Sequence, residues 1–276
     1  MRNLQCTEFL QHSLPRLRFR WAGFRKVCGR VCKRLNCRIG ELGLSGFSDY
    51  RDYIEEHTEE WRILDSMLQI TISRFYRDRG VFDIISSQLL PSLARNVVLS
   101  GGNELACWCA GCCSGEEAYT LQILWKTRVL PALHLDMPLK IIATDINPYV
   151  LKRAREGCYA ESSLGDLPGE LIQQAFQQSG NFYTVKEAFR ENIEFIEQDI
   201  RVHVPEGFFS LILCRNLVAT YFEDALQRYI LESILKKLSQ GGFFVMGIHE
   251  SLPDGTTGVV PYNNIPGIYE KKGQMQ

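Results

Sequence analysis

The sequence lacks the features that mark a membrane-spanning or secreted protein. Its longest apolar runs, such as residues 208–214, are far shorter than the roughly 20 residues that cross a bilayer. Residues 1–12 contain no apolar core of the kind found in a secretory signal. We therefore expect a cytoplasmic protein without a membrane partner. Its 276 residues are enough for one large domain with a smaller companion.

Cysteine is not scarce, but the ten cysteines do not form a recognisable framework. Without a secretory signal we expect a reducing compartment, so disulfides are disfavoured. Four cysteines lie close together, yet no second Cys or His pair follows them at zinc-finger spacing: Cys107, Cys109, Cys112 and Cys113. Alternate positions of one strand also point to opposite faces. We expect buried thiols and no metal site.

The net charge of −1 conceals a strong asymmetry between neighbouring segments. Residues 41–70 carry eight acids against two bases, whereas residues 1–40 carry a single acid, Glu8. The ten bases of residues 1–40 are Arg2, Arg16, Arg18, Arg20, Arg25, Lys26, Arg30, Lys33, Arg34 and Arg38. Apolar residues recur at helical spacing over 14–35, with bases between them. These bases form either a solvated surface of a small helical bundle or a binding surface for an acidic partner.

The chain changes character near residue 67. Residues 1–66 have helical patterns, and we predict a small N-terminal all-α domain there. Residues 67–276 alternate between apolar runs and helical patterns, which predicts an α/β domain with a doubly wound, mostly parallel sheet. The expected strands are 104–110, 139–146, 182–186, 192–199, 208–216, 243–249 and 267–271. The expected helices of this domain are 114–130, 147–156, 170–178 and 223–238.

The central motif is E-L-A-C-W-C-A-G-C-C-S-G-E-E over residues 104–117. It predicts a buried strand, a tight turn with Gly111 and Gly115, and a helix that begins with Glu116 and Glu117. Glycines allow the backbone to approach a ligand closely, and in doubly wound sheets this turn holds a nucleotide-like group. The Gly-x-x-x-Gly spacing lacks the three-glycine fingerprint of dinucleotide enzymes, and two glutamates would repel a phosphate. A neutral or cationic nucleoside fits better.

Polar residues also stand at the ends of the later strands. Asp145 ends one strand, where an acid can hold two ribose hydroxyls. Asp199 ends another and is placed to accept a hydrogen bond from an adenine amino group. Arg215 and Asn216 end a third, and Tyr221 follows them. A single strand-end Asp is commonly a helix cap, but four polar strand ends on one sheet edge favour a binding site.

Several motifs together resemble the CheR-type protein-glutamate O-methyltransferases. They are T-I-S-R-F-Y-R-D, A-G-C-C-S-G-E-E-A-Y, A-T-D-I-N-P-Y-V-L, L-C-R-N and G-G-F-F-V-M-G-I-H-E-S-L. The resemblance covers nearly the whole chain. It implies a class I methyltransferase-like fold, S-adenosyl-L-methionine as the methyl donor, and an acidic protein segment carrying a glutamate as the partner. The insert that forms the family's β-subdomain is expected to be shortened around 180–190.

The resemblance also implies roles for individual residues. Thr71, Ser73 and Arg77 are expected near the methionine end of the cofactor or the reacting centre. The other expected cofactor-binding residues are Gly111, Gly115, Glu116, Asp145, Asp199 and Asn216. The residues expected to act in catalysis are Arg77, Arg215 and Tyr221.

The expected chemistry suits these residue types. A glutamate carboxylate, with a pKa of about 4.3, is already an anion at neutral pH, so no general base is needed. An arginine fork can orient the carboxylate, and an aromatic or hydroxyl lining tolerates the sulfonium. Two alternatives stay open: a methyltransferase of a small molecule, and a non-catalytic module that kept the fold. The acidic stretch 41–70 and the net charge of −1 disfavour nucleic acid as a partner.

Overall fold

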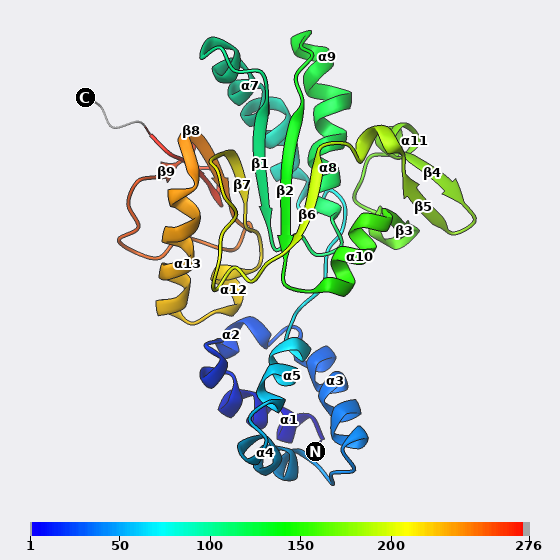
Figure 1. Cartoon of the computed structure of the whole chain (residues 1–276), viewed down its shortest axis with the longest axis vertical. Coiled ribbons are helices and arrows are strands. Elements are labelled where there is room, and N and C mark those ends of the chain that lie inside the picture. The colour runs from blue at the N-terminus through cyan, green and yellow to red at the C-terminus, as the bar shows by residue number, and fades with distance from the viewer. Residues whose placement is uncertain (1, 273–276) are drawn as a thin grey trace. The chain divides into compact units, whose positions relative to one another are not determined.

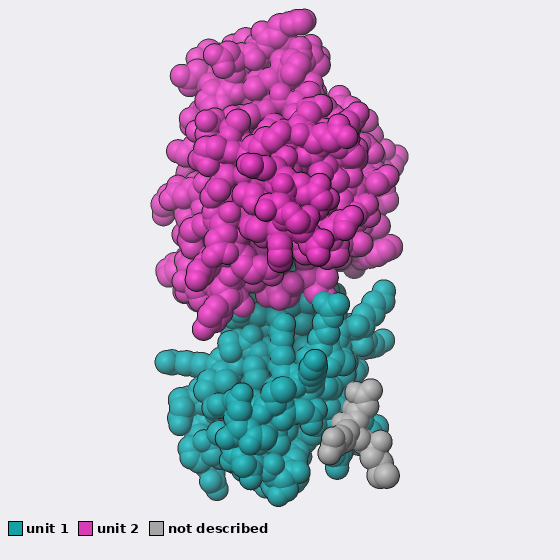
Figure 2. Space-filling view, turned by 90° about the vertical axis from the view of Figure 1, so that its right-hand side faces the viewer, with its two compact units in different colours: residues 1–70, 217–228 teal, residues 71–216, 229–276 magenta. Residues whose placement is uncertain are grey.

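The computed structural model describes residues 2–272, with side chains from Leu4 onward. These residues form two compact units, shown in different colours in Figure 2. One combines residues 1–70 with the segment 217–228, and the other combines 71–216 with 229–276. The predicted boundary at 66/67 lies close to the structural one, but the sequence pattern gave no sign that 217–228 belongs to the first unit. Within residues 2–272, no helix combines the length and apolar character that a bilayer crossing needs.

The first unit is helical. Its helices are α1 (Arg2–Ser13), α2 (Trp21–Phe24), α3 (Cys28–Glu41), α4 (Phe47–Glu56), α5 (Glu60–Met67) and α12 (Val218–Tyr221). The helical spacing over 14–35 does not give one continuous helix. Pro15, which has no N–H to donate, starts a separate short turn, and Arg18 ends that turn with a left-handed φ of 62°.

Aromatic packing explains why the segment 217–228 belongs to this unit. The ring of Phe19 stacks on Phe222 with centroids 5.2 Å apart, and Phe24 meets Tyr221 edge-on at 5.1 Å. The backbone N–H of Arg20 donates to the carbonyl of Tyr221 at 2.8 Å. Phe19 and Phe24 are therefore buried by partners some two hundred residues away in sequence.

The second unit is built on a mostly parallel sheet, as predicted (Figure 1). Its strands are β1 (Leu105–Ala110), β2 (Leu139–Asp145), β6 (Ile193–Glu197), β7 (Phe209–Leu213), β8 (Leu238–Val245), β9 (Val260–Pro261) and β10 (Ile268–Glu270). Among the described residues the sheet order is β6-β2-β1-β7-β8-β10-β9. The first five strands in this order pair in parallel, and β10 runs antiparallel to both neighbours.

The sheet order places a switch point between β1 and β7. The chain leaves β1 to form β2 and β6 on one side, then returns to form β7 and β8 on the other. Ligands of open α/β sheets bind outside the carboxyl ends of the strands at such a reversal. The helices of this unit are α6 (Arg79–Ile84), α7 (Leu90–Leu99), α8 (Glu116–Leu124), α9 (Leu130–Leu133), α10 (Pro148–Glu156), α11 (Gly169–Ala175) and α13 (Asp224–Lys236), the last of which begins in the first unit.

A second, small sheet lies between α10 and β6 in sequence and apart from the main sheet in Figure 1. It consists of β3 (Cys158–Ala160), β4 (Phe176–Ser179) and β5 (Phe182–Val185), paired antiparallel in the order β3-β5-β4. The helix predicted over 170–178 ends at Ala175, because the buried Phe176 pairs with Val185 instead. Part of the segment expected to be shortened, around 180–190, therefore belongs to an ordered sheet, and its shortening relative to the family stays a prediction.

The expectation that every cysteine is a thiol is wrong for one pair. Cys6 of α1 and Cys32 of α3 form a disulfide, with Cα atoms 5.9 Å apart. They are separated by 26 positions, so no local spacing pattern reveals the pair. The four cysteines of the central motif are buried free thiols, and burial raises the pKa of each: Cys107, Cys109, Cys112 and Cys113.

Candidate active site

The glycine turn after β1 is fixed to the end of β2. The N–H groups of Gly111 and Cys112 both donate to the carbonyl of Thr144, at 2.8 and 2.9 Å. Gly111 and Gly115 have positive φ values of 74° and 87°. A Cβ at Gly115 would also lie 3.0 Å from the Phe195 ring and 3.1 Å from Ala154. Close packing at the start of α8 therefore explains this glycine, while ligand approach stays the expectation for Gly111.

Asp145 connects the same turn to the end of β2. Its Oδ2 accepts a hydrogen bond from the Cys113 N–H at 2.9 Å, and its Oδ1 accepts one from the Asn147 N–H at 2.9 Å. Burial raises the pKa of this carboxyl, and the backbone hydrogen bonds act in the opposite direction. A carboxylate has about four acceptor positions, so capacity remains for the hydroxyls of a ribose.

Glu116, the first residue of α8, has a buried carboxyl group that is not fully hydrogen-bonded. It is 3% exposed, and within the described residues its Oε2 has no hydrogen-bond partner. Burial raises the pKa of Glu116 to about 7, although a hydrogen bond from Ser73 and the charge of Arg153 lower it. Buried polar atoms without partners are rare in native proteins. The position therefore suits a ligand that brings a positive charge or a hydrogen-bond donor.

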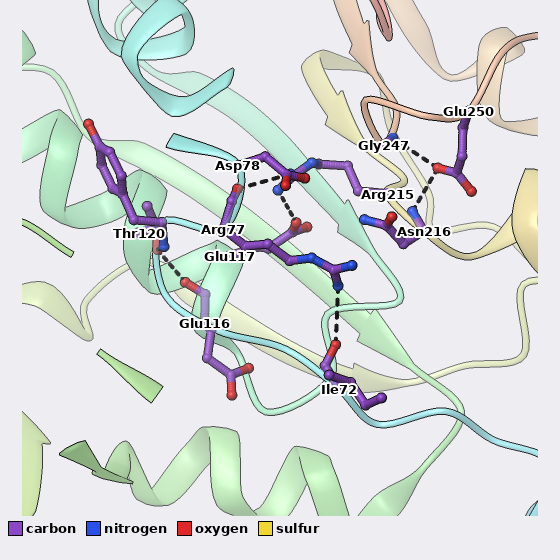
Figure 3. A network of polar contacts seen from close by, with 11 residues as sticks. Ile72, Arg77, Asp78, Glu116, Glu117, Thr120, Arg215, Asn216, Gly247 and Glu250 are labelled. Atoms are coloured by element: carbon purple, nitrogen blue, oxygen red, sulfur yellow. Dashed lines mark hydrogen bonds and ion pairs between the residues drawn. The ribbon is translucent and has the colours of Figure 1, made fainter. Parts of the chain in front are cut away.

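Arg215, just beyond the end of β7, is the centre of a buried charge cluster (Figure 3). Its side chain is 0% exposed. Nη1 donates to Glu117 Oε1 at 2.5 Å, and Nη2 donates to Asp78 Oδ2 at 2.7 Å and to the Arg77 carbonyl at 3.0 Å. The guanidinium also lies over the Phe82 ring, 5.2 Å from its centroid. Within the described residues the buried Nε has no hydrogen-bond partner. These contacts support a positioning role, because both Nη atoms are occupied by protein groups.

The cluster holds a loop with unusual backbone geometry. Tyr76 and Asp78 have left-handed φ values of 57° and 60°, which cost free energy for residues with a side chain. Thr71, Ser73 and Arg77 all lie on or beside this loop and are partly buried. Among the described residues, the Arg77 side chain has one long hydrogen bond, from Nη1 to the Ile72 carbonyl at 3.4 Å. Of the two predicted arginines, Arg77 is thus the one whose fork is open to a ligand.

Two groups near the predicted Asn216 were missed at the sequence level. Glu250 Oε2 accepts the N–H of Asn216 at 2.7 Å and the N–H of Gly247 at 2.8 Å. A Cβ at Gly247 would lie 2.9 Å from Asn216 Oδ1, so the close approach requires glycine. Both residues belong to the G-G-F-F-V-M-G-I-H-E-S-L motif, which was the available signal.

Asp199 and Tyr221 are placed differently from the residues above. Both oxygens of Asp199 contact the guanidinium of Arg201, at 2.9 and 3.0 Å from Nε. Its adenine-binding role stays a prediction, and a ligand there competes with this pair. Tyr221 belongs to the first compact unit, where its ring packs against Phe24. The second unit therefore does not bring Tyr221 together with the other predicted residues, and its catalytic role stays a prediction.

A comparison with known families identifies the family of the domain that contains this sheet edge. The model described as "CheR methyltransferase, SAM binding domain" matches residues 71–264. The chain belongs to the CheR methyltransferase family. The matched domain binds S-adenosylmethionine, so the predictions of the cofactor and of an S-adenosylmethionine-dependent methyltransferase are confirmed. The buried Glu116 and the strand-end Asp145 fit the positive charge and the ribose of that cofactor.

Curated relatives are similar in sequence to this chain over most of their length. The chemotaxis protein methyltransferase of Listeria innocua is 32% identical over 200 residues, 72% of this chain and 72% of the relative. That of Borreliella burgdorferi is 29% identical over 227 residues, 79% of this chain and 78% of the relative. Chemotaxis protein methyltransferase 1 of Pseudomonas aeruginosa is 28% identical over 246 residues, 87% of this chain and 84% of the relative.

The raised pKa of Glu116 predicts a pH-dependent cofactor affinity. The free protein holds the Glu116 proton up to a pKa of about 7, whereas a cationic ligand favours the ionised form. Affinity for S-adenosylmethionine, measured by calorimetry, should rise by up to about tenfold per pH unit between about pH 5.5 and 7 and then level off. Burial of Glu116 should also make folding stability decrease as pH rises from about 4.5 through about 7, because the folded state retains the proton longer.

Two variants distinguish the effect of Glu116 on cofactor affinity from the effect of Asp145. Glu116→Gln should bind more weakly above pH 7 and lose the dependence on pH. Asp145→Asn should weaken binding at every pH while keeping that dependence, because it removes a ribose contact and not the titrating group. A folded Glu116→Gln variant with wild-type affinity and wild-type pH dependence would contradict this assignment.

The two arginines should differ when each is replaced by lysine. A lysine at position 215 cannot bridge Glu117, Asp78 and the Arg77 carbonyl together. The free energy of unfolding should therefore fall by about 1–3 kcal/mol, and kcat should fall with it. Arg77→Lys should lower turnover without changing the melting temperature, because its side chain makes one long hydrogen bond. Thermal melts and kcat measurements check both. Wild-type stability and turnover in Arg215→Lys would rule out its positioning role.

Proposed function

We propose that this chain transfers a methyl group from S-adenosylmethionine to a glutamate side chain on an acidic segment of a protein, and that chemoreceptors are its acceptors. The relatives named as chemotaxis methyltransferases support this acceptor class. The observation that carries the proposal is that two different side chains near the switch point are available to the two reactants. Glu116 is open to a cation and Arg77 to a carboxylate, and Figure 3 shows both side chains extending away from the Arg215 guanidinium.

The residues of the site act by binding and orientation. When bound, S-adenosylmethionine supplies a methyl group on a positively charged sulfur. Glu116 and Asp145 would hold the charged and ribose parts of the cofactor, and Arg77 would orient the acceptor carboxylate. That carboxylate is already an anion, with a pKa of about 4.3, so no side chain has to remove a proton. Holding reacting atoms about 3–3.5 Å apart in line is a large effect by itself.

Only some of the ten bases are available to dock an acidic partner, because others are already paired within the first unit. Five of the ten bases have partners within their own unit: Arg16 with Glu55, Arg18 with Glu223, Arg20 with the carbonyls of Ala219 and Thr220, Arg34 with those of Met67 and Gln69, and Arg38 with Glu60. The side chain of Arg2 lies outside the described residues. The remaining four are exposed and form no side-chain ion pair with any described residue: Arg25, Lys26, Arg30 and Lys33. We call these four the basic surface.

The acceptor class is tested by the chemistry of the product. The protein is incubated with methyl-labelled S-adenosylmethionine and a receptor signalling fragment that contains glutamates in an acidic helix. We expect label on the fragment that mild base releases as methanol, because a carboxyl methyl ester is base-labile and a methylamine is not. Replacing the fragment's glutamates by alanine should abolish the label. Base-stable label, or label only on small molecules, would overturn the proposal.

The basic surface should contribute to acceptor affinity and not to cofactor affinity. Reversing Lys26, Arg30 and Lys33 to Glu should raise KM for the receptor fragment by about tenfold or more at low salt, with S-adenosylmethionine affinity unchanged. Arg34 is left intact because it holds two backbone carbonyls. The matched control reverses the exposed Arg95, Lys140 and Lys236, which gives the same change in net charge. Equal KM values for the two triple variants would remove the basic surface from docking.

A further inference from the structure

The first unit contains a cluster of three cysteine sulfurs that methyl transfer does not use. Cys28 and Cys32 lie on one face of α3, four residues apart, and Cys6 reaches them from α1. The three Sγ atoms all lie within 4.8 Å of one another. Cys6 and Cys32 form the disulfide, and the free Sγ of Cys28 lies 3.5 Å from that of Cys32. We call this group the three-sulfur cluster.

An open pocket gives access to the cluster at Cys28. It has a volume of about 420 Å³ and is lined by Leu4, Thr7, Trp21, Arg25, Cys28 and Gly29. Cys28 is partly exposed there, whereas Cys6 and Cys32 are buried. The Thr7 hydroxyl lies 3.9 Å from the Cys28 sulfur, within reach of a weak hydrogen bond. Ions and water from solvent can therefore reach one side of the cluster.

We propose that the three-sulfur cluster, once its disulfide is reduced, binds a thiophilic divalent metal ion such as zinc through three thiolates. Zinc–sulfur bonds of about 2.3 Å at tetrahedral angles place sulfurs about 3.8 Å apart. Cys28 and Cys32 are already at 3.5 Å, so only the bond between Cys6 and Cys32 has to open. The pocket at Cys28 leaves a fourth position for water or a small ligand.

The two steps balance in electrons, protons and charge. Two equivalents of a thiol reductant give two electrons and two protons to the Cys6–Cys32 disulfide and form one disulfide of their own. The two new thiols and the existing thiol of Cys28 then lose three protons to bind one divalent ion, which leaves a net charge of −1 on the site. Arg25 in the pocket wall carries the opposite charge. The disulfide and the metal ion are alternative links between α1 and α3.

Metal titration of the full chain tests this site independently of methyl transfer. The protein is reduced with dithiothreitol, freed of the reductant without oxygen, and titrated with cobalt(II), whose thiolate complexes absorb strongly in the near ultraviolet. We expect one cobalt per chain and displacement by zinc. Oxidised protein should bind at least about 100-fold more weakly, because two of the three ligands are then in a disulfide.

Serine variants identify the ligands. Cys28→Ser should lose the charge-transfer band and at least about 100-fold in affinity, since it removes one ligand while leaving Cys6 and Cys32 able to pair. Cys37→Ser is the matched control, because Cys37 is an exposed cysteine of the same helix outside the cluster. Zinc should raise the melting temperature of reduced wild type and of reduced Cys37→Ser, and should leave that of Cys28→Ser unchanged.

Three outcomes would overturn the proposal. The first is reduced wild type that binds no cobalt, even if the disulfide forms and breaks reversibly. The second is wild-type binding by Cys28→Ser. The third is loss of binding in Cys37→Ser, which would assign the ligands elsewhere.

Discussion

The buried guanidinium of Arg215 is the contact on which the candidate site depends. A charge without solvent is costly unless it is paired and hydrogen-bonded. The two Nη atoms of Arg215 meet this requirement by joining three segments that are far apart in sequence: the end of β7, the first turn of α8 through Glu117, and the loop at Asp78. The loop has two left-handed residues, so it needs such an external restraint to keep its shape. The position of Arg77 follows from this pairing.

The two neighbouring glutamates of α8 show how one short motif can serve both structure and ligand binding. Consecutive helical residues point about 100° apart, so Glu116 and Glu117 face different surroundings. Glu117 is paired with Arg215 and belongs to the buried cluster. Glu116 has an oxygen without a partner among the described residues, and burial raises its pKa to about 7. The first glutamate therefore suits a cationic ligand, and the second holds the arginine that orders the adjacent loop.

The sequence predicts the central sheet well, because buried parallel strands are continuous apolar runs. Polar residues mark the ends of these strands, and glycines mark the turn after the first of them. It predicts long-range pairings poorly. The contacts of Phe19 with Phe222 and of Cys6 with Cys32 join distant segments and leave no periodic signal. The motifs named Arg215 and Glu116 as candidate site residues, and those roles stay predictions, but no motif indicated that Arg215 would be enclosed by carboxylates. Asp199 is a different case, since its partner Arg201 is only two residues away and was visible in the sequence.

The charge asymmetry of the first seventy residues has two possible physical origins: ion pairs within the unit and a surface that faces a partner. Part of the basic excess is internal, because Arg16 and Arg38 pair with Glu55 and Glu60 from the acidic stretch, and Arg18 pairs with Glu223. Composition alone therefore overstates the charge that is presented to a partner. What remains is the basic surface on and just before α3. Exposed charges are screened beyond about 8–10 Å at physiological ionic strength, so four bases act on a partner only at short range. Such a surface can orient an acidic helix that has already arrived, which agrees with a protein acceptor better than with the long-range attraction of a polyphosphate.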